Sequence, residues 1–236
     1  MDDTTLDETL LALFSRFDQA LENEEVQVAR VCLDELTVVL GDDDPEVAYC
    51  TARLSWLLHG DETGIEALLR VVEQHPDHAE AHYDLGCLFE CRDEVKRAVT
   101  HFLRVRALDA MNDRELGLGS EEEIDGIERV AREVIEGLPA RFLERLSHVP
   151  VLIERRPSRA LVESGFDPRA FGLFEGPTDA MQGEPMPTRI VLYAANLLAE
   201  FTDEETLREQ VEVTVLHEIG HYFGLSEEDL ERLGLD

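Results

Sequence analysis

The spacing of small and apolar residues in the segment 76–109 constrains the fold of this chain more than any other feature. In "PDHAEAHYDLGCLFECRDEVKRAVTHFLRVRALD", such residues recur at helical intervals on both sides of Arg92-Asp93. This spacing predicts two amphipathic helices joined by a short turn. Because Gly86 and Ala98 are small, we expect the two helices to cross closely at these positions.

A second copy of this pattern precedes the first. In the segment that begins at Pro45, Ala52 takes the place of Gly86 and Gly64 takes that of Ala98. A third and weaker copy lies further upstream. The pattern resembles the tetratricopeptide repeat, a helix–turn–helix unit of 34 residues.

The resemblance to tetratricopeptide repeats covers about residues 6–112. It implies an all-α domain in which helix pairs stack in a right-handed array, with atypical repeats at the ends. A domain of this kind implies a protein partner or a protein substrate that it recruits.

The four cysteines all lie in the first half of the chain, and none forms a CxxC pair. A secreted disulfide framework is therefore not expected. Cys87 and Cys91 lie one helical turn apart, with His82 and His101 nearby in sequence. Cysteines at helical spacing are most often small core residues, so packing is the favoured interpretation and a metal site there is the alternative.

After residue 112 the pattern changes. Ser120 and Glu123 form a capping box that predicts a helix ending at Gly137, and Pro139 suits the first turn of a shorter helix. Alternation in "HVPVLIERRPS", together with "AFGLFEG" and "RIVLY", then predicts three short strands. The three prolines within 177–187 predict a loop between the second and third strands.

We therefore expect an α+β architecture with two domains. Residues 1–112 form the tetratricopeptide-like helical-repeat domain, residues 113–119 form a linker, and residues 120–236 form a small α+β domain.

The last long helix carries the chemistry. Thr202 and Glu205 predict its capped start, and it is expected to run to about Phe223. It contains His217-Glu218-Ile219-Gly220-His221, which matches the H-E-x-x-H pattern. Residues four apart share one face of a helix, so both imidazoles can bind one zinc ion. Glu218 lies beside the first histidine and is the candidate general base for a water molecule that the metal activates.

A third ligand is expected from the residues after His221. Gly224 can end the helix in a left-handed conformation that turns the chain back towards the metal. Glu227 then stands where H-E-x-x-H-x-x-G-x-x-E requires a ligand, and the fifteen residues after His221 leave little room for one on a separate helix. Local alternatives remain among the neighbouring acidic residues Glu228, Asp229 and Glu231, and the helix start "SEEDL" with Ser226 as its N-cap also explains these carboxylates without a metal.

The segment from about 125 to 236 resembles the bacterial zincin-like metallopeptidases, also called minimal zincins. The matching pieces are "VPVLIERRP", "FGLFEGP", "MPTRIVLYAANLL" and "VTVLHEIGHYFGLSEEDL", in this order. The resemblance implies a compact α+β fold, a zinc site completed by an acidic residue at the position of Glu227, and peptidase activity. It does not imply a particular substrate.

The charge excludes several partners. The net charge is −32, and each half of the chain carries −16. Nucleic-acid binding requires a concentrated basic face and anionic membranes repel an acidic surface, so neither partner is expected. The acidic start of the chain lacks the features of a signal peptide, no apolar run is long enough to span a membrane, and a cytoplasmic location is expected.

Two functions follow from these features. The first is a zinc metallopeptidase with a repeat domain that recruits a partner or a peptide or protein substrate. The alternative is a non-catalytic interaction protein with a structural or vestigial zinc site. Peptide hydrolysis also needs a group that stabilises the oxyanion, for which Tyr222 and Tyr193 are candidates.

Overall fold

The computed structural model describes residues 3–178 and 188–235. The chain forms two compact units, Met1–Val105 and Arg106–Asp236. The division falls within helix α6 (Val95–Leu116). This helix continues through residues 113–116, which the sequence analysis assigns to a linker, and the linker boundary stays a prediction.

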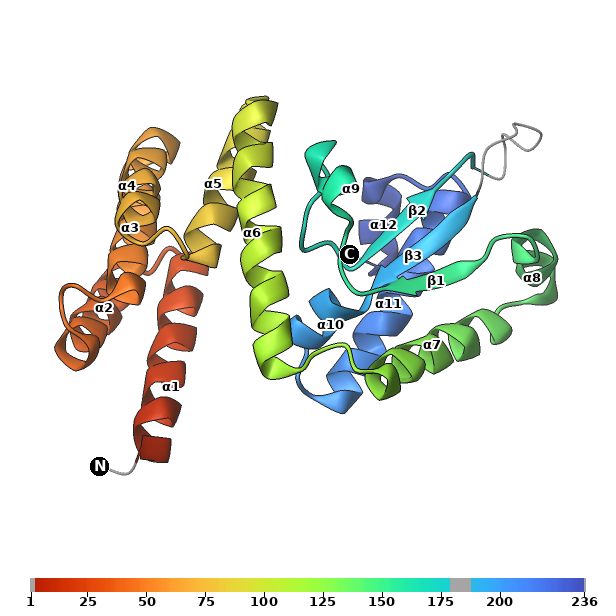
Figure 1. Ribbon diagram of the computed structural model, residues 1–236, viewed down its shortest axis with the longest axis horizontal. Coiled ribbons are helices and arrows are strands. Elements are labelled where there is room, and N and C mark those ends of the chain that lie inside the picture. The colour runs from red at the N-terminus through yellow and green to blue at the C-terminus, as the bar shows by residue number, and fades with distance from the viewer. Residues whose placement is uncertain (1–2, 179–187, 236) are drawn as a thin grey trace. The chain divides into compact units, whose positions relative to one another are not determined.

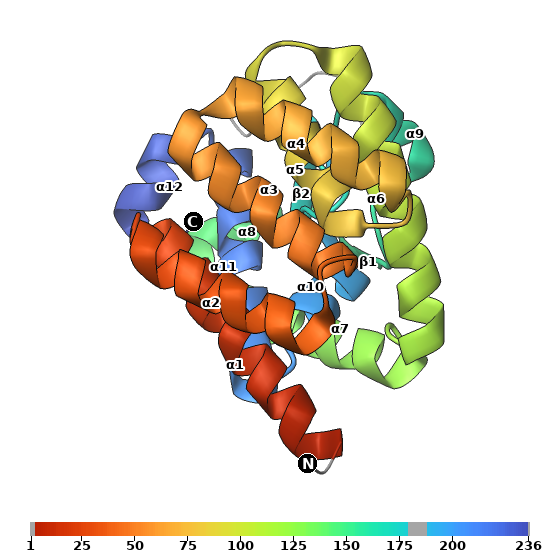
Figure 2. The ribbon, with the colours of Figure 1, turned by 90° about the vertical axis from the view of Figure 1, so that its left-hand side faces the viewer.

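The first unit is built from helices, as the sequence predicts. It contains α1 (Asp3–Glu22), α2 (Val26–Leu40), α3 (Pro45–His59), α4 (Asp61–Gln74), α5 (Ala79–Cys91) and the first part of α6. No strand occurs in its described residues. From α1 to α5, each helix contacts the next one in the sequence. Figures 1 and 2 both show α2, α3 and α4 side by side in this order. An all-helical unit of this kind is compatible with helical repeats.

Small residues do lie at close contacts within this unit. A Cβ atom built on Gly86 would lie 2.3 Å from the ring of Phe102 on α6, so any larger residue would force the two apart. A Cβ atom on Gly64 would likewise lie 2.6 Å from Trp56. Ala98 is 3% exposed. The predicted break after α5 is confirmed, because α5 ends at Cys91 and α6 begins at Val95.

The second unit contains a small sheet and the remaining helices. All three predicted strands are present, as β1 (Val151–Glu154), β2 (Gly172–Glu175) and β3 (Arg189–Tyr193). The strand order is β1-β3-β2, with β1 parallel and β2 antiparallel to β3. The sheet thus ends in β2, whose outer edge pairs with no strand among the described residues. Residues 179–187 of the predicted loop lie outside the described residues.

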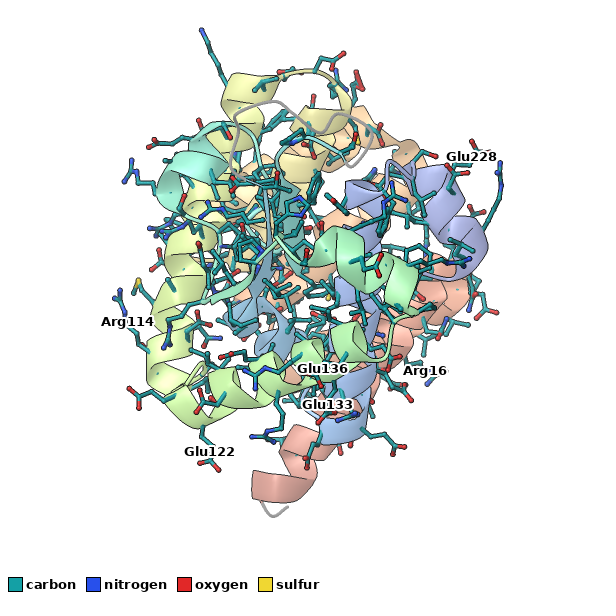
Figure 3. All side chains as sticks on the ribbon, turned by 90° about the vertical axis from the view of Figure 1, so that its right-hand side faces the viewer. Arg16, Arg114, Glu122, Glu133, Glu136 and Glu228 are labelled. Carbon is teal, nitrogen blue, oxygen red and sulfur yellow. The ribbon has the colours of Figure 1, made fainter. Side chains whose placement is uncertain are left out.

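Helices cover this sheet and close the core. They are α7 (Glu121–Glu136), α8 (Ala140–Leu146), α9 (Arg159–Glu163), α10 (Ala194–Glu200), α11 (Glu204–Tyr222) and α12 (Glu227–Leu233). The helix α11 contacts β2, β3 and α7, while α7 also contacts β1. One apolar cluster fills the space between them, and it includes Ile127, Ile190, Leu192, Val211 and Val215. Figure 3 shows Glu122 pointing away from α7, and Glu133 of the same helix forms an ion pair with Arg208 of α11 at 2.7 Å.

Two helix starts differ in how well the sequence predicted them. The capping box of Ser120 and Glu123 at the start of α7 is confirmed. The predicted cap at Thr202 is wrong, because Asp203 is the N-cap of α11 and its carboxylate accepts hydrogen bonds from both the N–H and the hydroxyl of Thr206. Threonine and aspartate are both good caps, and the structure uses the aspartate one residue later. The short helices α9 and α10 were not predicted.

A buried polar network fixes the chain before β2. Arg156 donates to both carboxylate oxygens of Asp113, at 2.6 and 2.7 Å, and to Asp109 at 3.2 Å. It also bonds the side-chain oxygen of Asn196, whose amide nitrogen donates to the carbonyls of Pro168 and Ala170 at 3.0 and 2.6 Å. Buried hydrogen bonds to the carbonyls of Pro168 and Ala170 therefore fix the loop that leads into β2.

The described helices include none that combines the length and the apolar character of a membrane-spanning segment.

Candidate metal centre

Helix α11 brings its two histidines together. His217 and His221 lie one turn apart on one face, and their Nε2 atoms are 2.9 Å from each other. Their side chains are 23% and 25% exposed, so the pair lies at the border between core and solvent. Two nitrogen atoms thus face one point at the surface of the second unit.

Glu227 reaches the same point from the next helix. Gly224 ends α11 with φ +82°, and Ser226 caps α12, whose first residue is Glu227. Glu227 Oε1 lies 3.2 Å from His221 Nε2, and Oε2 lies 3.6 Å from His217 Nε2. Among the described residues, these three form the one group of three or more His, Cys, Asp or Glu side chains that could hold an ion.

None of the local alternatives Glu228, Asp229 and Glu231 belongs to this group. Glu228 bonds Arg232, and Asp229 forms the capping box with Ser226. The helix-start interpretation of "SEEDL" is therefore correct for Ser226 and Asp229, while Glu227 at the same helix start faces the histidines.

The donor set fits zinc. Two imidazole nitrogens and one carboxylate oxygen are a ligand set found at catalytic zinc sites, where a fourth position stays open. The described part of the chain places no fourth His, Cys, Asp or Glu in this group. The alternative metal site at Cys87 and Cys91 receives no such support, since no group of this size forms around them in the described residues.

Glu218 lies beside this group but faces the sheet. It is 6% exposed and accepts a hydrogen bond from the backbone of Phe174 on β2. Burial raises the pKa of Glu218 to about 7, against the opposing effects of His217 and of the Phe174 hydrogen bond. A carboxylate with a pKa near neutrality can both accept and return a proton.

Gly172 makes room for this carboxylate. A Cβ atom at residue 172 would lie 2.6 Å from Glu218 Oε1 and 2.9 Å from a methyl carbon of Thr214. Only glycine therefore lets α11 approach β2 this closely. Sequence reasoning missed Gly172, although a glycine inside a short strand is a signal that something approaches the backbone.

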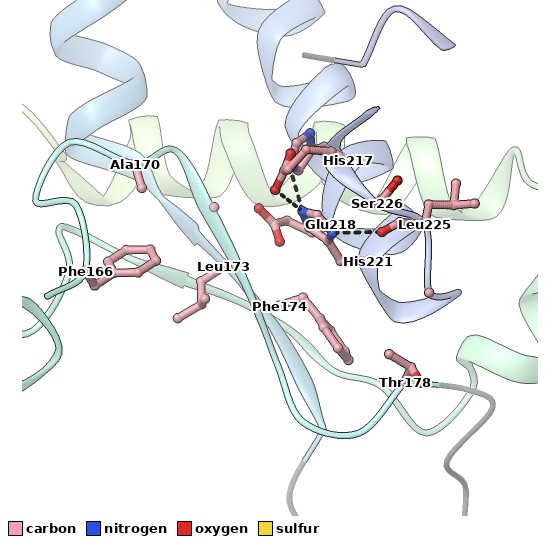
Figure 4. A pocket seen from close by; sticks show the side chains of 13 residues that line it. Phe166, Ala170, Leu173, Phe174, Thr178, His217, Glu218, His221, Leu225 and Ser226 are labelled. Carbon is pink, nitrogen blue, oxygen red and sulfur yellow. Dashed lines mark hydrogen bonds and ion pairs between the residues drawn. The ribbon is translucent and has the colours of Figure 1, made fainter. Parts of the chain in front are cut away.

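The candidate site opens into a cavity of about 570 Å³. Figure 4 shows Phe166, Leu173 and Phe174 on one side and the two histidines on the other. A second cavity of about 230 Å³ shares Gly172, His217 and Glu218 with it and reaches Leu235. Space is thus available on both sides of Glu218, along the free edge of β2.

The structure does not bring the tyrosine candidates into this cavity. Tyr222 is 1% exposed, donates to the Arg145 carbonyl at 3.0 Å and packs edge-on against Phe174. Tyr193 is also buried and lies behind Phe166, with the ring centroids 6.1 Å apart. The cavity wall holds the hydroxyl groups of Thr178 and Ser226 instead, and Ser226 is used as a helix cap.

Comparison with known protein families agrees with this geometry. Residues 146–235 match the model of the zincin-like metallopeptidase family. The match spans the three strands and both helices of the candidate centre, so this part of the chain is zincin-like. No curated protein matches the chain.

Proposed function

We propose that the second unit is a zinc-dependent peptidase in which His217, His221 and Glu227 bind the metal and Glu218 is the general base. The observation that carries the proposal is the meeting of three ligand atoms within 4.8 Å of one another, beside a buried carboxylate at the wall of a cavity. An open coordination position favours a catalytic over a structural zinc site.

The roles of the side chains follow from their positions. A zinc ion in this site supplies the Lewis acidity that polarises a peptide carbonyl and favours deprotonation of water. Glu218 accepts a proton from the attacking water while the oxygen atom of that water bonds to the carbonyl carbon of the substrate. When the C–N bond breaks, Glu218 returns this proton to the leaving amine.

The edge of β2 provides a place for the substrate backbone. Tyr193 N–H donates to the Phe171 carbonyl at 2.8 Å, so residues 171, 173 and 175 bond to β3 while residues 172 and 174 face outward. An extended peptide can pair with the outward groups of Gly172 and with the Phe174 carbonyl, next to Glu218, which accepts from the Phe174 N–H. Phe166, Leu173 and Phe174 favour an apolar side chain near the cleaved bond.

The first unit is proposed to recruit a protein partner or the substrate itself. Support comes from its all-helical architecture and from the repeat pattern in its sequence. The alternative, an interaction protein with an idle zinc site, does not explain the cavity beside Glu218.

Metal content and hydrolysis together test the proposal. Purified wild type should hold one zinc per chain and cleave members of a peptide library, and a chelator should abolish cleavage. His221→Ala and Glu227→Gln should lose zinc, whereas Glu228→Gln, next to Glu227 but bonded to Arg232, should retain it. Zinc binding without cleavage of any peptide or of captured partners would support the interaction protein instead.

A further inference from the structure

Both histidines of the candidate centre bond a backbone carbonyl through the ring nitrogen that faces away from the site. His221 Nδ1 lies 3.3 Å from the Leu225 carbonyl, and His217 Nδ1 lies 2.6 Å from the Leu235 carbonyl. A carbonyl oxygen can only accept, so each Nδ1 carries the hydrogen. Both Nε2 lone pairs then face each other across 2.9 Å, which is the arrangement that a shared cation stabilises.

The two carbonyls are presented by the same backbone motif. Gly224 ends α11 with φ +82°, and the N–H of Leu225 donates back to the Gly220 carbonyl at 3.0 Å. Gly234 ends α12 with φ +69°, and the N–H of Leu235 donates back to the Leu230 carbonyl at 3.1 Å. Each pair is a Schellman cap, in which a left-handed glycine reverses the chain. In both, the carbonyl of the following leucine meets a histidine.

We propose that the Gly234 cap is a positioning element of the metal centre, because it holds the Leu235 carbonyl against His217 Nδ1. This inference rests on the proposed metal site. It gives α12 a role at each end, since Glu227 lies at its start and Leu235 follows its end. Groups that orient a ligating histidine in this way fix its tautomer and its ring.

The second unit contains another Schellman cap, at Gly117, whose following carbonyl contacts no histidine. Gly117 ends α6 with φ +72°, and the N–H of Leu118 donates to the Asp113 carbonyl at 2.9 Å. The Leu118 carbonyl accepts from Arg155 rather than from a histidine. Neither Gly117 nor Gly234 has an atom within 4 Å of a built Cβ, so a substitution at either strains the backbone without a steric clash.

The test compares Zn²⁺ affinity, measured by competition with a chromophoric chelator, in wild type and three variants of the full chain. Gly234→Val disfavours the left-handed conformation and should weaken Zn²⁺ binding by about 10- to 100-fold. Gly234→Asn should restore most of the affinity, since asparagine tolerates this conformation. Gly117→Val should bind Zn²⁺ like wild type.

A second measurement observes the tautomer of His217 directly. Long-range ¹H–¹⁵N NMR of the metal-free wild type should show His217 protonated at Nδ1, and Gly234→Val should lose this preference. The proposal is overturned if His217 carries its proton at Nε2, or if folded Gly234→Val binds Zn²⁺ as tightly as wild type. If wild type binds no Zn²⁺, the proposed metal site fails first and this inference fails with it.

Discussion

The two units bury different kinds of side chain. Of the buried polar or charged residues in the described chain, His78 lies in the first unit, and the second unit holds Asp109, Asp113, Asn196, Thr214 and Glu218. The first unit is closed by apolar and small residues between helices. The second holds charged side chains inside its core, and Asp109, Asp113 and Asn196 bond Arg156 next to the loop that leads into β2.

One ion pair from each unit shows the same contrast. Arg156 and Asp113 are 7% and 5% exposed, whereas Arg53 and Asp18 in the first unit are 25% and 48% exposed. Buried charges are costly unless every partner is present, so they are seldom favoured by stability alone. The contrast teaches that packing determines the first unit, whereas the second also maintains a polar arrangement needed at its site.

The largest expected effect comes from breaking the buried network. Arg156→Ala should destabilise the second unit by about 3–5 kcal/mol, because it leaves the buried Asp113 carboxylate without its partner. Arg53→Ala should cost the first unit less, about 1–2 kcal/mol, because its pair with Asp18 is partly exposed and its guanidinium also lies over the rings of Phe17 and Tyr49. Fluorescence of Trp56, the single tryptophan, reports on the first unit, and hydrogen exchange of residues 106–236 reports on the second. Equal losses of unfolding free energy in the two variants would contradict the proposed difference between the units.

A smaller effect is expected from two glycines in close contacts. Gly86→Ala should destabilise the first unit by about 1–3 kcal/mol through overpacking against Phe102, and leave hydrolysis unchanged. Gly172→Ala should instead displace Glu218 and lower kcat by up to about 10²-fold, with zinc retained. Thermal unfolding, zinc content and peptide turnover of both variants check this. Reduced turnover in Gly86→Ala, or unchanged turnover in Gly172→Ala, would show that the two contacts do not differ in this way.

A third difference is expected in the pH dependence of the metal-free units. The pKa of Glu218 is raised from 4.5 to about 7, so its contribution to stability is lost as pH rises between these values. Burial lowers the pKa of His101 from 6.5 to about 4, so stability of the first unit falls as pH drops from 6.5 towards 4. Glu218→Gln should stabilise the second unit above pH 7. His101→Gln should reduce the loss of stability of the first unit between pH 6.5 and pH 4. Unfolding curves measured at several pH values, with a chelator present, check both signs. A second unit that gains stability as pH rises from 4.5 to 7, or a first unit that gains stability as pH drops from 6.5 to 4, would contradict this prediction.

The sequence predicted elements that depend on local pattern. The repeat helices, the three strands and the Ser120 capping box follow from spacing and capping chemistry within short windows. The convergence of His217 and His221 follows from helical geometry in the same way. The direction of Glu227 was expected from the turn at Gly224, although local rivals remained.

Features that depend on the tertiary fold were not predicted. The partners of Arg156 lie about forty residues away on either side, and no local pattern pairs them. Gly172 is required only because Glu218 and Thr214 arrive from a distant helix. The tyrosine candidates were chosen for proximity in sequence, and the fold places Tyr222 and Tyr193 in the core instead. Burial and long-range contact decide these positions.

The most direct test of the account compares peptide hydrolysis by wild type and Glu218→Gln, both loaded with one zinc per chain. The glutamine keeps the shape of the side chain and removes its ability to accept the proton. The account predicts equal zinc content and a fall in kcat/KM of about 10²-fold or more, the usual scale for losing a general base. Hydrolysis by Glu218→Gln at the wild-type rate would contradict it.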